Sequence, residues 1–196
     1  MPLTDMRNAE TIDALVGLFT ECGFLSLSVQ DMARLSKRSK STLYGVAASK
    51  DGIIEAVVRE FFRRATENVE REVAGEGPRE RLGSYLSAIA AQLAHVDRRF
   101  FDDLGAFGPA RRIYLANIRS ASERVQQLAL AALPEHSRVD PRFVGVVAGL
   151  VIESIHRGEV EAATGLTAAE GYAALSELLS AGISHAAHTH TESDRT

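Results

Sequence analysis

The 196-residue sequence lacks several features that mark particular classes of protein. Cys22 is the only cysteine, so no disulfide can form within one chain, and we expect a reducing, cytoplasmic location. No uncharged apolar run reaches about 18 residues, and charged residues interrupt the first twenty positions, so neither a transmembrane helix nor a signal peptide is expected. Alternating β-branched runs and two-residue hairpin turns are almost absent, which argues against a sheet.

The sequence also lacks an excess of positive charge and the common motifs of catalysis. Its 22 Lys and Arg residues are outnumbered by 26 Asp and Glu residues, so any contact with nucleic acid must be local and cannot depend on bulk charge. It has no glycine-rich phosphate loop, no Gly-x-Ser-x-Gly and no His-Glu-x-x-His. We therefore expect no enzyme, no cofactor and no metal site.

Apolar residues recur at helical spacing from end to end, which predicts an all-α protein. Gly and Pro mark the ends of most of these periodic segments, whereas the residues after 188 are polar and are expected to form a disordered tail. The predicted helices are 8–22, 28–36, 39–46, 49–73, 78–95, 97–107, 109–133, 141–158 and 167–188.

Residues 28–50 form a small basic region in an acidic chain. They hold five basic residues and one acidic residue, a local charge of +4, which leaves −8 for the remainder. Two short helices joined by a tight turn, of which the second is polar, are typical of a helix-turn-helix. Lys40, Ser41 and Thr42 are polar and not bulky, as a helix entering the DNA major groove requires near its N-terminus.

In residues 9–60 the sequence resembles the DNA-binding region of the tetracycline-repressor (TetR) family. The resemblance implies an N-terminal three-helix helix-turn-helix domain (1–50), a larger C-terminal helical ligand-binding and dimerisation domain (51–188) and the tail (189–196). The matching residues are Leu18-Phe19, Gly23-Phe24, Ser28-Val29, Asp31-Met32-Ala33, Ser39-Lys40-Ser41-Thr42-Leu43-Tyr44 and Ser49-Lys50-Asp51.

The resemblance also implies roles for individual residues in binding double-stranded DNA. Lys40, Ser41, Thr42 and Gly45 would face bases. Lys37 and Arg38, which depart from the family pattern, are expected from their own positive charge to add phosphate contacts. The residues that would hold the phosphate backbone are Ser28, Ser39, Tyr44 and Lys50. The residues expected in the core of this region, from the resemblance and from helical spacing, are Val29, Met32, Ala33, Leu35 and Leu43.

Three departures from the family pattern favour an alternative. The turn usually carries Gly and a small apolar residue, whereas this chain has Lys37-Arg38. An aromatic residue usually follows three positions after the Tyr, whereas this chain has Ala47, and Gly45 offers no side chain to a base. The alternative is a helical binding or scaffold protein with a degenerate helix-turn-helix and no sequence-specific DNA recognition.

The two last long helices are expected to form a homodimer, because both carry dense apolar stripes, although the same stripes could fill an intramolecular core. Gly145, Ala148 and Gly149 would let the paired backbones approach closely. The stripes are Phe143, Val146, Val147, Leu150, Val151 and Ile155, and Leu166, Tyr172, Leu175, Leu178, Leu179 and Ile183.

The resemblance also implies that the C-terminal helices bind a small effector, which would release a repressor from a near-palindromic operator. The apolar candidate residues favour a hydrophobic or aromatic effector. His95 and His156 are the polar residues expected to face inward, and Glu153 is placed to orient the His156 ring or to form a solvated pair. The candidate effector residues, each of which could equally belong to the core, are Tyr85, Ile89, His95, Phe101, Phe107, Tyr114, Ile118 and His156.

Overall fold

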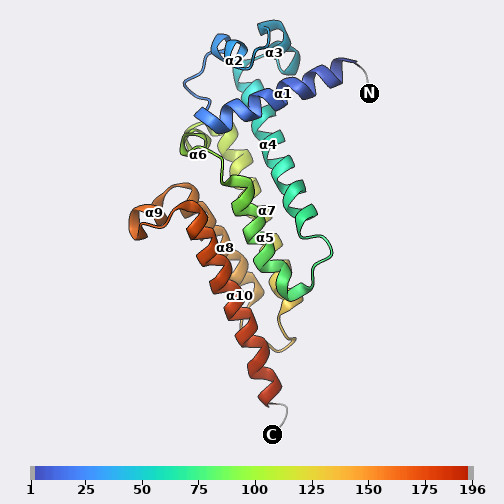
Figure 1. The fold of residues 1–196 in the computed structure, drawn as a ribbon, viewed down its shortest axis with the longest axis vertical. Coiled ribbons are helices and arrows are strands. Elements are labelled where there is room, and N and C mark those ends of the chain that lie inside the picture. The colour runs from blue at the N-terminus through green and yellow to red at the C-terminus, as the bar shows by residue number, and fades with distance from the viewer. Residues whose placement is uncertain (1–2, 194–196) are drawn as a thin grey trace. The chain divides into compact units, whose positions relative to one another are not determined.

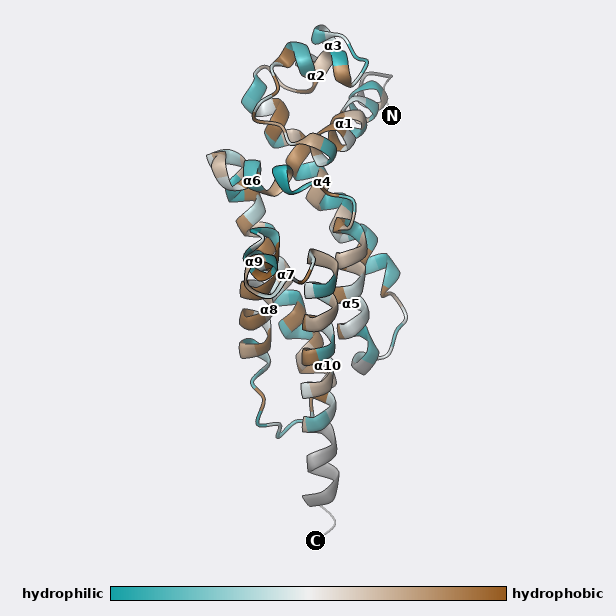
Figure 2. Cartoon of the chain, turned by 60° about the vertical axis from the view of Figure 1, so that its left-hand side comes forward, coloured by the Kyte–Doolittle hydropathy of each residue, from teal (hydrophilic) through white to brown (hydrophobic). Residues whose placement is uncertain are grey.

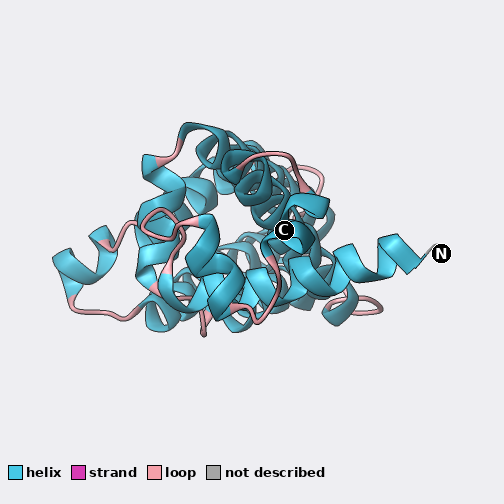
Figure 3. Ribbon diagram, turned by 90° about the horizontal axis from the view of Figure 1, so that it is seen from above, coloured by secondary structure: helices cyan, strands magenta, loops and turns pink. Residues whose placement is uncertain are grey.

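The computed structural model describes the backbone of residues 3–193 and the side chains of residues 6–78 and 80–186. Every regular element in this part of the chain is an α-helix, joined by short loops (Figures 1 and 3), which confirms the all-α prediction. The helices are α1 (Leu3–Cys22), α2 (Val29–Leu35), α3 (Lys40–Val46), α4 (Lys50–Glu72), α5 (Pro78–Leu93), α6 (Arg98–Ala106), α7 (Gly108–Ala132), α8 (Pro141–His156), α9 (Glu159–Thr164) and α10 (Ala168–Ser193). No helix of the described chain is long and apolar enough to cross a membrane.

Side-chain caps set the helix starts that the sequence predicts. Ser28 and Asp31 form a capping box at α2: the Ser28 hydroxyl accepts from the Asp31 N–H, and the Asp31 carboxylate accepts from the Ser28 N–H, each over 3.1 Å. At three other helices the cap is a side chain that accepts a backbone N–H: Ser39 accepts from Thr42 at α3, Asp97 from Arg99 at α6 and Asp140 from Arg142 at α8. Such caps satisfy N–H groups that have no partner within a helix, so they act over only three residues.

One helix is additional to the prediction, and two helix ends differ from it by five residues each. The structure adds α9 between Gly158 and Gly165, whose left-handed backbones, at φ of 69° and 77°, frame one short helix where the sequence suggested only a break. α1 begins at Leu3 rather than at residue 8. α10 continues to Ser193, so residues 189–193 are helical rather than a disordered tail, because no Gly or Pro follows Gly182. The rest of the expected tail, residues 194–196, lies outside the described residues.

The chain divides into two compact units at positions other than residue 50. The head unit contains the residues up to Thr66 together with His95–Ala116, and the body unit contains Glu67–Ala94 together with the residues from Asn117 onward. The helix-turn-helix therefore shares its unit with most of α4, with α6 and with the start of α7.

Aromatic side chains explain why α6 belongs to the head unit. The Phe24 ring, after α1, lies 5.3 Å from the Phe19 ring and 5.9 Å from the Phe100 ring of α6. The Phe100 ring lies 4.9 Å from the ring of Phe61 on α4. All four side chains are buried. Tilted and edge-on aromatic pairs at these separations are favourable beyond their buried area, so the cluster holds three helices and the α1–α2 connection together.

Small residues determine the packing of α8 in the body unit. α8 is hydrophobic along most of its length (Figure 2). A Cβ atom at Gly145 would lie 2.6 Å from the backbone oxygen of Ser122 on α7, and one at Gly149 would lie 3.2 Å from the Ser122 side chain. The Ser122 hydroxyl donates a 2.6 Å hydrogen bond to the Gly145 carbonyl. Gly145, Ala148 and Gly149 are all buried. The expectation that they serve close approach between two chains is therefore wrong, because Gly145 and Gly149 face α7 of the same chain and Ala148 is buried within that chain.

We predict that Gly145→Ala lowers the free energy of unfolding by roughly 1–3 kcal/mol, because the added methyl group overlaps the α7 backbone, which cannot rotate away. Chemical denaturation of the two proteins measures the difference. Gly105→Ala on α6 is the control: nothing lies within 4 Å of its Cβ position, so this change should be neutral or slightly stabilising. Equal stability of Gly145→Ala and wild type would contradict the close packing of α7 and α8.

Candidate nucleic-acid interface and effector residues

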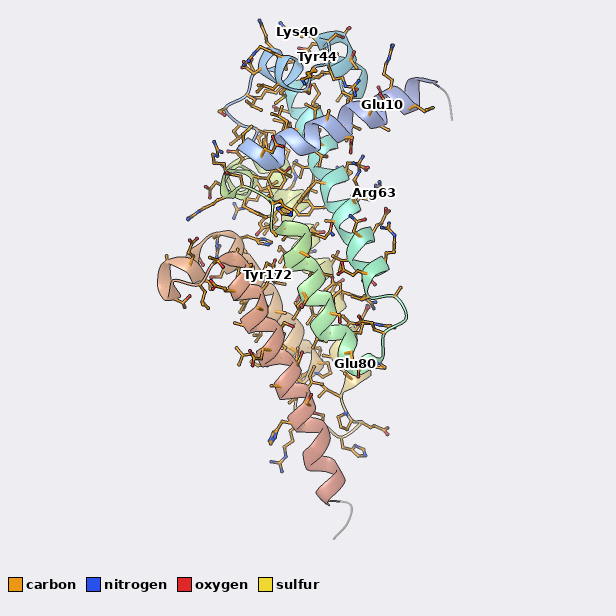
Figure 4. The ribbon with its side chains drawn as sticks, viewed as in Figure 1. Glu10, Lys40, Tyr44, Arg63, Glu80 and Tyr172 are labelled. Carbon is orange, nitrogen blue, oxygen red and sulfur yellow. The ribbon has the colours of Figure 1, made fainter. Side chains whose placement is uncertain are left out.

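The helix-turn-helix pair presents one polar and largely exposed face. In α3 only Leu43 is buried, whereas Lys40, Ser41 and Gly45 are exposed, and Tyr44 is 49% exposed. Lys40 and Tyr44 both extend from α3 at the end of the head unit that carries α2 and α3 (Figure 4). An exposed face without large aliphatic side chains is what a helix needs to approach the edges of base pairs.

The core of the helix-turn-helix is smaller than the sequence suggests. Met32 and Ala33 of α2 are buried, as expected. Val29 is only half-buried, and Leu35 is 42% exposed, so its placement in the core is wrong. Leu35 is the last residue of α2, where the chain turns away, and no further helical turn covers it.

Hydrogen bonds tie most of the predicted DNA-binding side chains to their neighbours. The Ser39 hydroxyl accepts from the Thr42 N–H over 3.1 Å and lies 2.7 Å from the Thr42 hydroxyl. Ser28 is likewise occupied in its capping box. Lys40 Nζ donates to Gln30 Oε1 of α2 over 3.2 Å. These bonds orient the polar face before any partner binds.

Sequence reasoning missed two residues that support α3. Gln30 contacts Lys40, and Asn8 Nδ2 of α1 donates a 3.2 Å hydrogen bond to the Gly45 carbonyl at the end of α3. Carbonyl groups in the last turn of a helix need such external donors. Gln30 stands in the first turn of α2, within the basic region, but Asn8 gave no signal because only the tertiary fold brings α1 to α3.

The atypical turn is closed, and Lys37 adopts a left-handed backbone. Its φ of 56° is the only positive value for a residue other than glycine in the described chain. The Arg38 N–H still donates to the Ala33 carbonyl over 2.9 Å, and the Arg38 guanidinium pairs with Glu10 of α1 over 3.7 Å. The turn geometry that usually calls for glycine is therefore present, with a strained lysine in its place.

The space beside Ala47, where the family pattern has an aromatic residue, is also filled. A Cβ atom at Gly52 would lie only 3.0 Å from the Ala47 Cβ, so the first turn of α4 approaches Ala47 closely. Val46 and Ala47 are half-buried. The loss of a large side chain is thus accommodated by close approach of α4.

The Lys50 side chain forms a hydrogen bond to the connection between α1 and α2. Its Nζ donates a 3.0 Å hydrogen bond to the carbonyl of Leu25, and the residue is half-buried. The resemblance implies a phosphate contact for this residue, so its bond to the α1–α2 connection is a separate feature of this chain.

Charge is divided unequally between the two units. The head unit holds thirteen Lys and Arg residues against eleven Asp and Glu residues, whereas the body unit holds nine against fifteen. The net charges are therefore +2 and −6. Since the total is acidic, the electrostatic attraction for a polyanion is confined to the head unit.

The candidate effector residues are divided between the two units. Phe101, Phe107 and Tyr114 belong to the head unit, where Tyr114 is buried and the two phenylalanines are half-buried. The Phe101 ring lies 5.7 Å from Phe100, the Phe107 ring lies 6.5 Å from Phe24, and the Tyr114 ring stacks 6.1 Å from Phe62. His95 is exposed, so the expectation that it faces inward is wrong. It follows the end of α5 and precedes the Asp97 cap of α6, where the chain crosses the surface.

Tyr85, Ile89, Ile118 and His156 belong to the body unit, where Tyr85, Ile118 and His156 are buried and Ile89 is half-buried. Burial raises the pKa of Tyr85 to about 12, with a further contribution from Glu70, which pairs with Arg124 over 2.7 and 2.8 Å. The Tyr85 hydroxyl is therefore neutral and able to donate at physiological pH.

His156 faces inward, as predicted, and its partner is Tyr172. His156 Nε2 lies 2.7 Å from the Tyr172 hydroxyl, and both side chains are buried (Tyr172 is labelled in Figure 4). Burial lowers the pKa of His156 to about 3, so the ring is neutral. The sequence suggests that Glu153 orients this ring or forms a solvated pair. In the structure, Arg157 Nη1 donates to Glu153 Oε1 over 3.3 Å.

The apolar stripes of α8 and α10 separate into buried and exposed residues. Ile155, Tyr172, Leu175 and Ile183 are buried within the chain. Phe143, Val146, Leu150 and Leu178 are 67%, 55%, 63% and 72% exposed. Phe143, Val146 and Leu150 recur at steps of three and four and therefore line one outer face of α8.

Solved structures identify the fold. No sequence-family model matches the chain, and no curated protein matches it in sequence. The regulatory protein TetR from Rhodobacter sphaeroides superposes with a TM-score of 0.69 at 15% identity, over 89% of this chain and 97% of that one. A TetR/AcrR-family regulator from Thermobifida fusca YX-ER1 gives 0.63 at 22% identity over the same shares. A TetR-like regulator from Rhodococcus sp. RHA1 gives 0.57 at 19% identity, over 94% and 98%.

The chain therefore has the fold of the TetR-family transcriptional regulators, over almost its whole length. The resemblance found in residues 9–60 is confirmed at the level of the fold and extends to the C-terminal helices, for which the sequence gave only helical periodicity.

We predict that Lys37→Gly raises the free energy of unfolding by about 0.5–1 kcal/mol, because glycine adopts the left-handed conformation without strain, although it gains entropy in the unfolded chain. Thermal or chemical denaturation measures the change. Arg38→Gly, at a neighbouring position without positive φ, is the control and should be destabilising. If Lys37→Gly is destabilising to the same extent as Arg38→Gly, the left-handed turn is not the source of strain.

We predict that His156 makes the protein lose stability in mild acid. The folded state keeps the ring neutral down to about pH 3, whereas the unfolded chain protonates it near pH 6.5. Its contribution is therefore complete above pH 6.5 and is lost as the pH falls, by up to about 1.4 kcal/mol per pH unit. Unfolding measured between pH 7 and 5 should show this slope in wild type and not in His156→Gln. His95→Gln, which alters an exposed ring, should behave as wild type, and a wild-type slope in His156→Gln would refute the assignment.

Proposed function

We propose that this chain is a homodimeric, ligand-responsive DNA-binding transcriptional regulator that acts as a repressor. The observation that carries the proposal is the exposed, polar face of α3, held by caps and by Gln30 and Asn8, on the more basic of the two units. The fold supports the same reading.

For the DNA contacts, α3 would lie in the major groove with Lys40, Ser41, Thr42 and the backbone at Gly45 toward the bases. The side chains proposed to hold the phosphates are Ser28, Lys37, Arg38, Ser39 and Tyr44. The closed turn at Lys37 and the filled space beside Ala47 favour a working helix-turn-helix over a degenerate scaffold module.

For the dimer, the exposed apolar residues of α8 and α10 would pair with the same residues of a second copy. Four helices would then form a bundle about a two-fold axis. The axis would place two copies of α3 about one DNA turn, or a multiple of it, apart and so requires a near-palindromic operator.

For the effector, we propose the body unit near His156 as its binding region, with Tyr85, Ile89 and Ile118 as further contacts. The neutral His156 ring, the Tyr172 hydroxyl and the apolar neighbours suit a hydrophobic or aromatic molecule with one polar group. It would release the operator only by binding more tightly to a conformation with wrongly spaced heads.

Selection from a random-sequence duplex library tests the proposed DNA binding. The full-length protein should enrich a near-palindrome whose half-sites are one helical turn or a multiple apart, and should bind it with a log–log salt slope that reflects several phosphates. Enrichment of no common sequence, with weak binding to every duplex, would support the scaffold alternative and refute the regulator.

We predict that Leu150→Glu converts the proposed dimer to a monomer, because it places a charge within the exposed apolar face of α8. Sedimentation or light scattering measures the mass. Leu130→Glu on α7 is the matched control, since Leu130 is 64% exposed but lies outside α8 and α10. A Leu150→Glu protein that stays dimeric, or a monomeric Leu130→Glu protein, would place the interface elsewhere.

A further inference from the structure

The helix-turn-helix segment, residues 26–49, is joined to the rest of the head unit at two points. Leu25 precedes it and Lys50, the first residue of α4, follows it. The structure bonds these two ends directly, because Lys50 Nζ donates to the Leu25 carbonyl over 3.0 Å. The segment is therefore closed into a loop by a side chain as well as by its covalent path.

Leu25 is also held by α6, through a hydrogen bond to Asp103. The Asp103 carboxylate accepts the Phe24 N–H over 2.5 Å and the Leu25 N–H over 2.9 Å. Hydrogen bonds to an ionised carboxylate are about twice as strong as those between neutral groups. Leu25 is thus bonded to Asp103 of α6 through its N–H and to Lys50 of α4 through its carbonyl.

The backbone before Leu25 is shaped to admit Asp103. Gly23 has a φ of +77°, and a Cβ atom there would lie 2.6 Å from Asp103 Oδ2. A second bond supports the approach of α6, since the Asp97 N–H donates to the Thr20 carbonyl over 2.8 Å. Phe24, between them, is fully buried in the aromatic cluster.

We propose that Asp103 and Lys50 are positioning residues that clamp Leu25 and thereby set the orientation of α2 and α3 for DNA. Neither residue contacts DNA in this assignment. The proposal rests on the proposed DNA-binding function and deepens it, because it assigns operator affinity to a residue on α6 and reassigns Lys50 from phosphate contact to the clamp.

A phosphate contact and a clamp role for Lys50 predict different effects of its loss on the salt dependence of DNA binding. A lysine that contacts phosphate releases a counterion, so its loss lowers the log–log salt slope by about 0.9. A lysine bonded to Leu25 changes affinity through geometry and leaves the slope as it was. Asp103 is acidic, whereas a residue that binds a DNA phosphate is basic. Loss of Asp103 should therefore weaken DNA binding only if the clamp is needed.

The experiment measures binding of full-length protein to the duplex enriched by wild type, at several salt concentrations. Asp103→Ala should weaken binding roughly 10- to 100-fold, the range expected for loss of hydrogen bonds to a charged group. Asp103→Asn, which keeps an acceptor oxygen, should fall between Asp103→Ala and wild type. Lys50→Met should weaken binding at an unchanged salt slope.

Matched variants control for charge. Asp102→Ala removes the same charge from the neighbouring, exposed position of α6, and Arg59→Met removes a positive charge from an exposed position of α4. Both should bind as wild type does. Binding by Asp103→Ala that equals that of Asp102→Ala would overturn the proposal, and a Lys50→Met slope lower by about one would return Lys50 to the phosphate.

Amide hydrogen exchange in the free protein tests the clamp without DNA. The Phe24 and Leu25 amides should exchange at least about tenfold faster in Asp103→Ala, or in Asp103→Asn if the alanine variant does not fold, and at the wild-type rate in Asp102→Ala. Unchanged exchange would overturn the clamp. A wild-type protein that selects no duplex would instead refute the DNA-binding function, so the two failures are distinguishable.

Discussion

The connection between α1 and α2 is the constraint on which the head unit depends. Within this connection, the N–H groups of Phe24 and Leu25 lie in a packed unit and need acceptors. The Asp103 carboxylate of α6 accepts hydrogen bonds from both. Buried N–H groups without partners are costly, so α6 cannot leave this position without loss. The aromatic cluster of Phe19, Phe24 and Phe100 adds apolar contact to the same junction. Together they make a helix from the middle of the sequence part of the same unit as the helix-turn-helix.

Helix packing in the body unit depends on two glycines of α8. Gly145 and Gly149 bring α8 against Ser122 of α7, at a distance that no Cβ atom could occupy without displacement. With that face of α8 used internally, its bulky residues Phe143, Val146 and Leu150 remain on the outer face. A contiguous apolar surface of this kind on a protein in water favours association. The same helix thus contributes to the core and carries an exposed apolar face.

The two units differ in charge and in the polar groups that they hold. The head unit carries a small positive charge and its polar face, whereas the body unit is acidic and holds neutral, buried polar groups at His156 and Tyr172. Burial keeps the His156 ring uncharged, so an apolar environment persists around it at neutral pH. The head unit, by contrast, has a local electrostatic attraction for a polyanion that the whole chain lacks.

The sequence by itself determined the helical class, most helix starts and the polar face of α3, because capping and helical periodicity act within three or four residues. The helices predicted to start at Ser28, Ser39 and Ser49 are capped by these side chains for that reason. The tertiary structure decided what depends on residues far apart in the chain. It joined Asp103 to Phe24 across 79 positions, turned Lys50 to Leu25, exposed His95 and paired His156 with Tyr172. Local patterns cannot predict such pairs, since each requires knowing which helices pack together and at what distance.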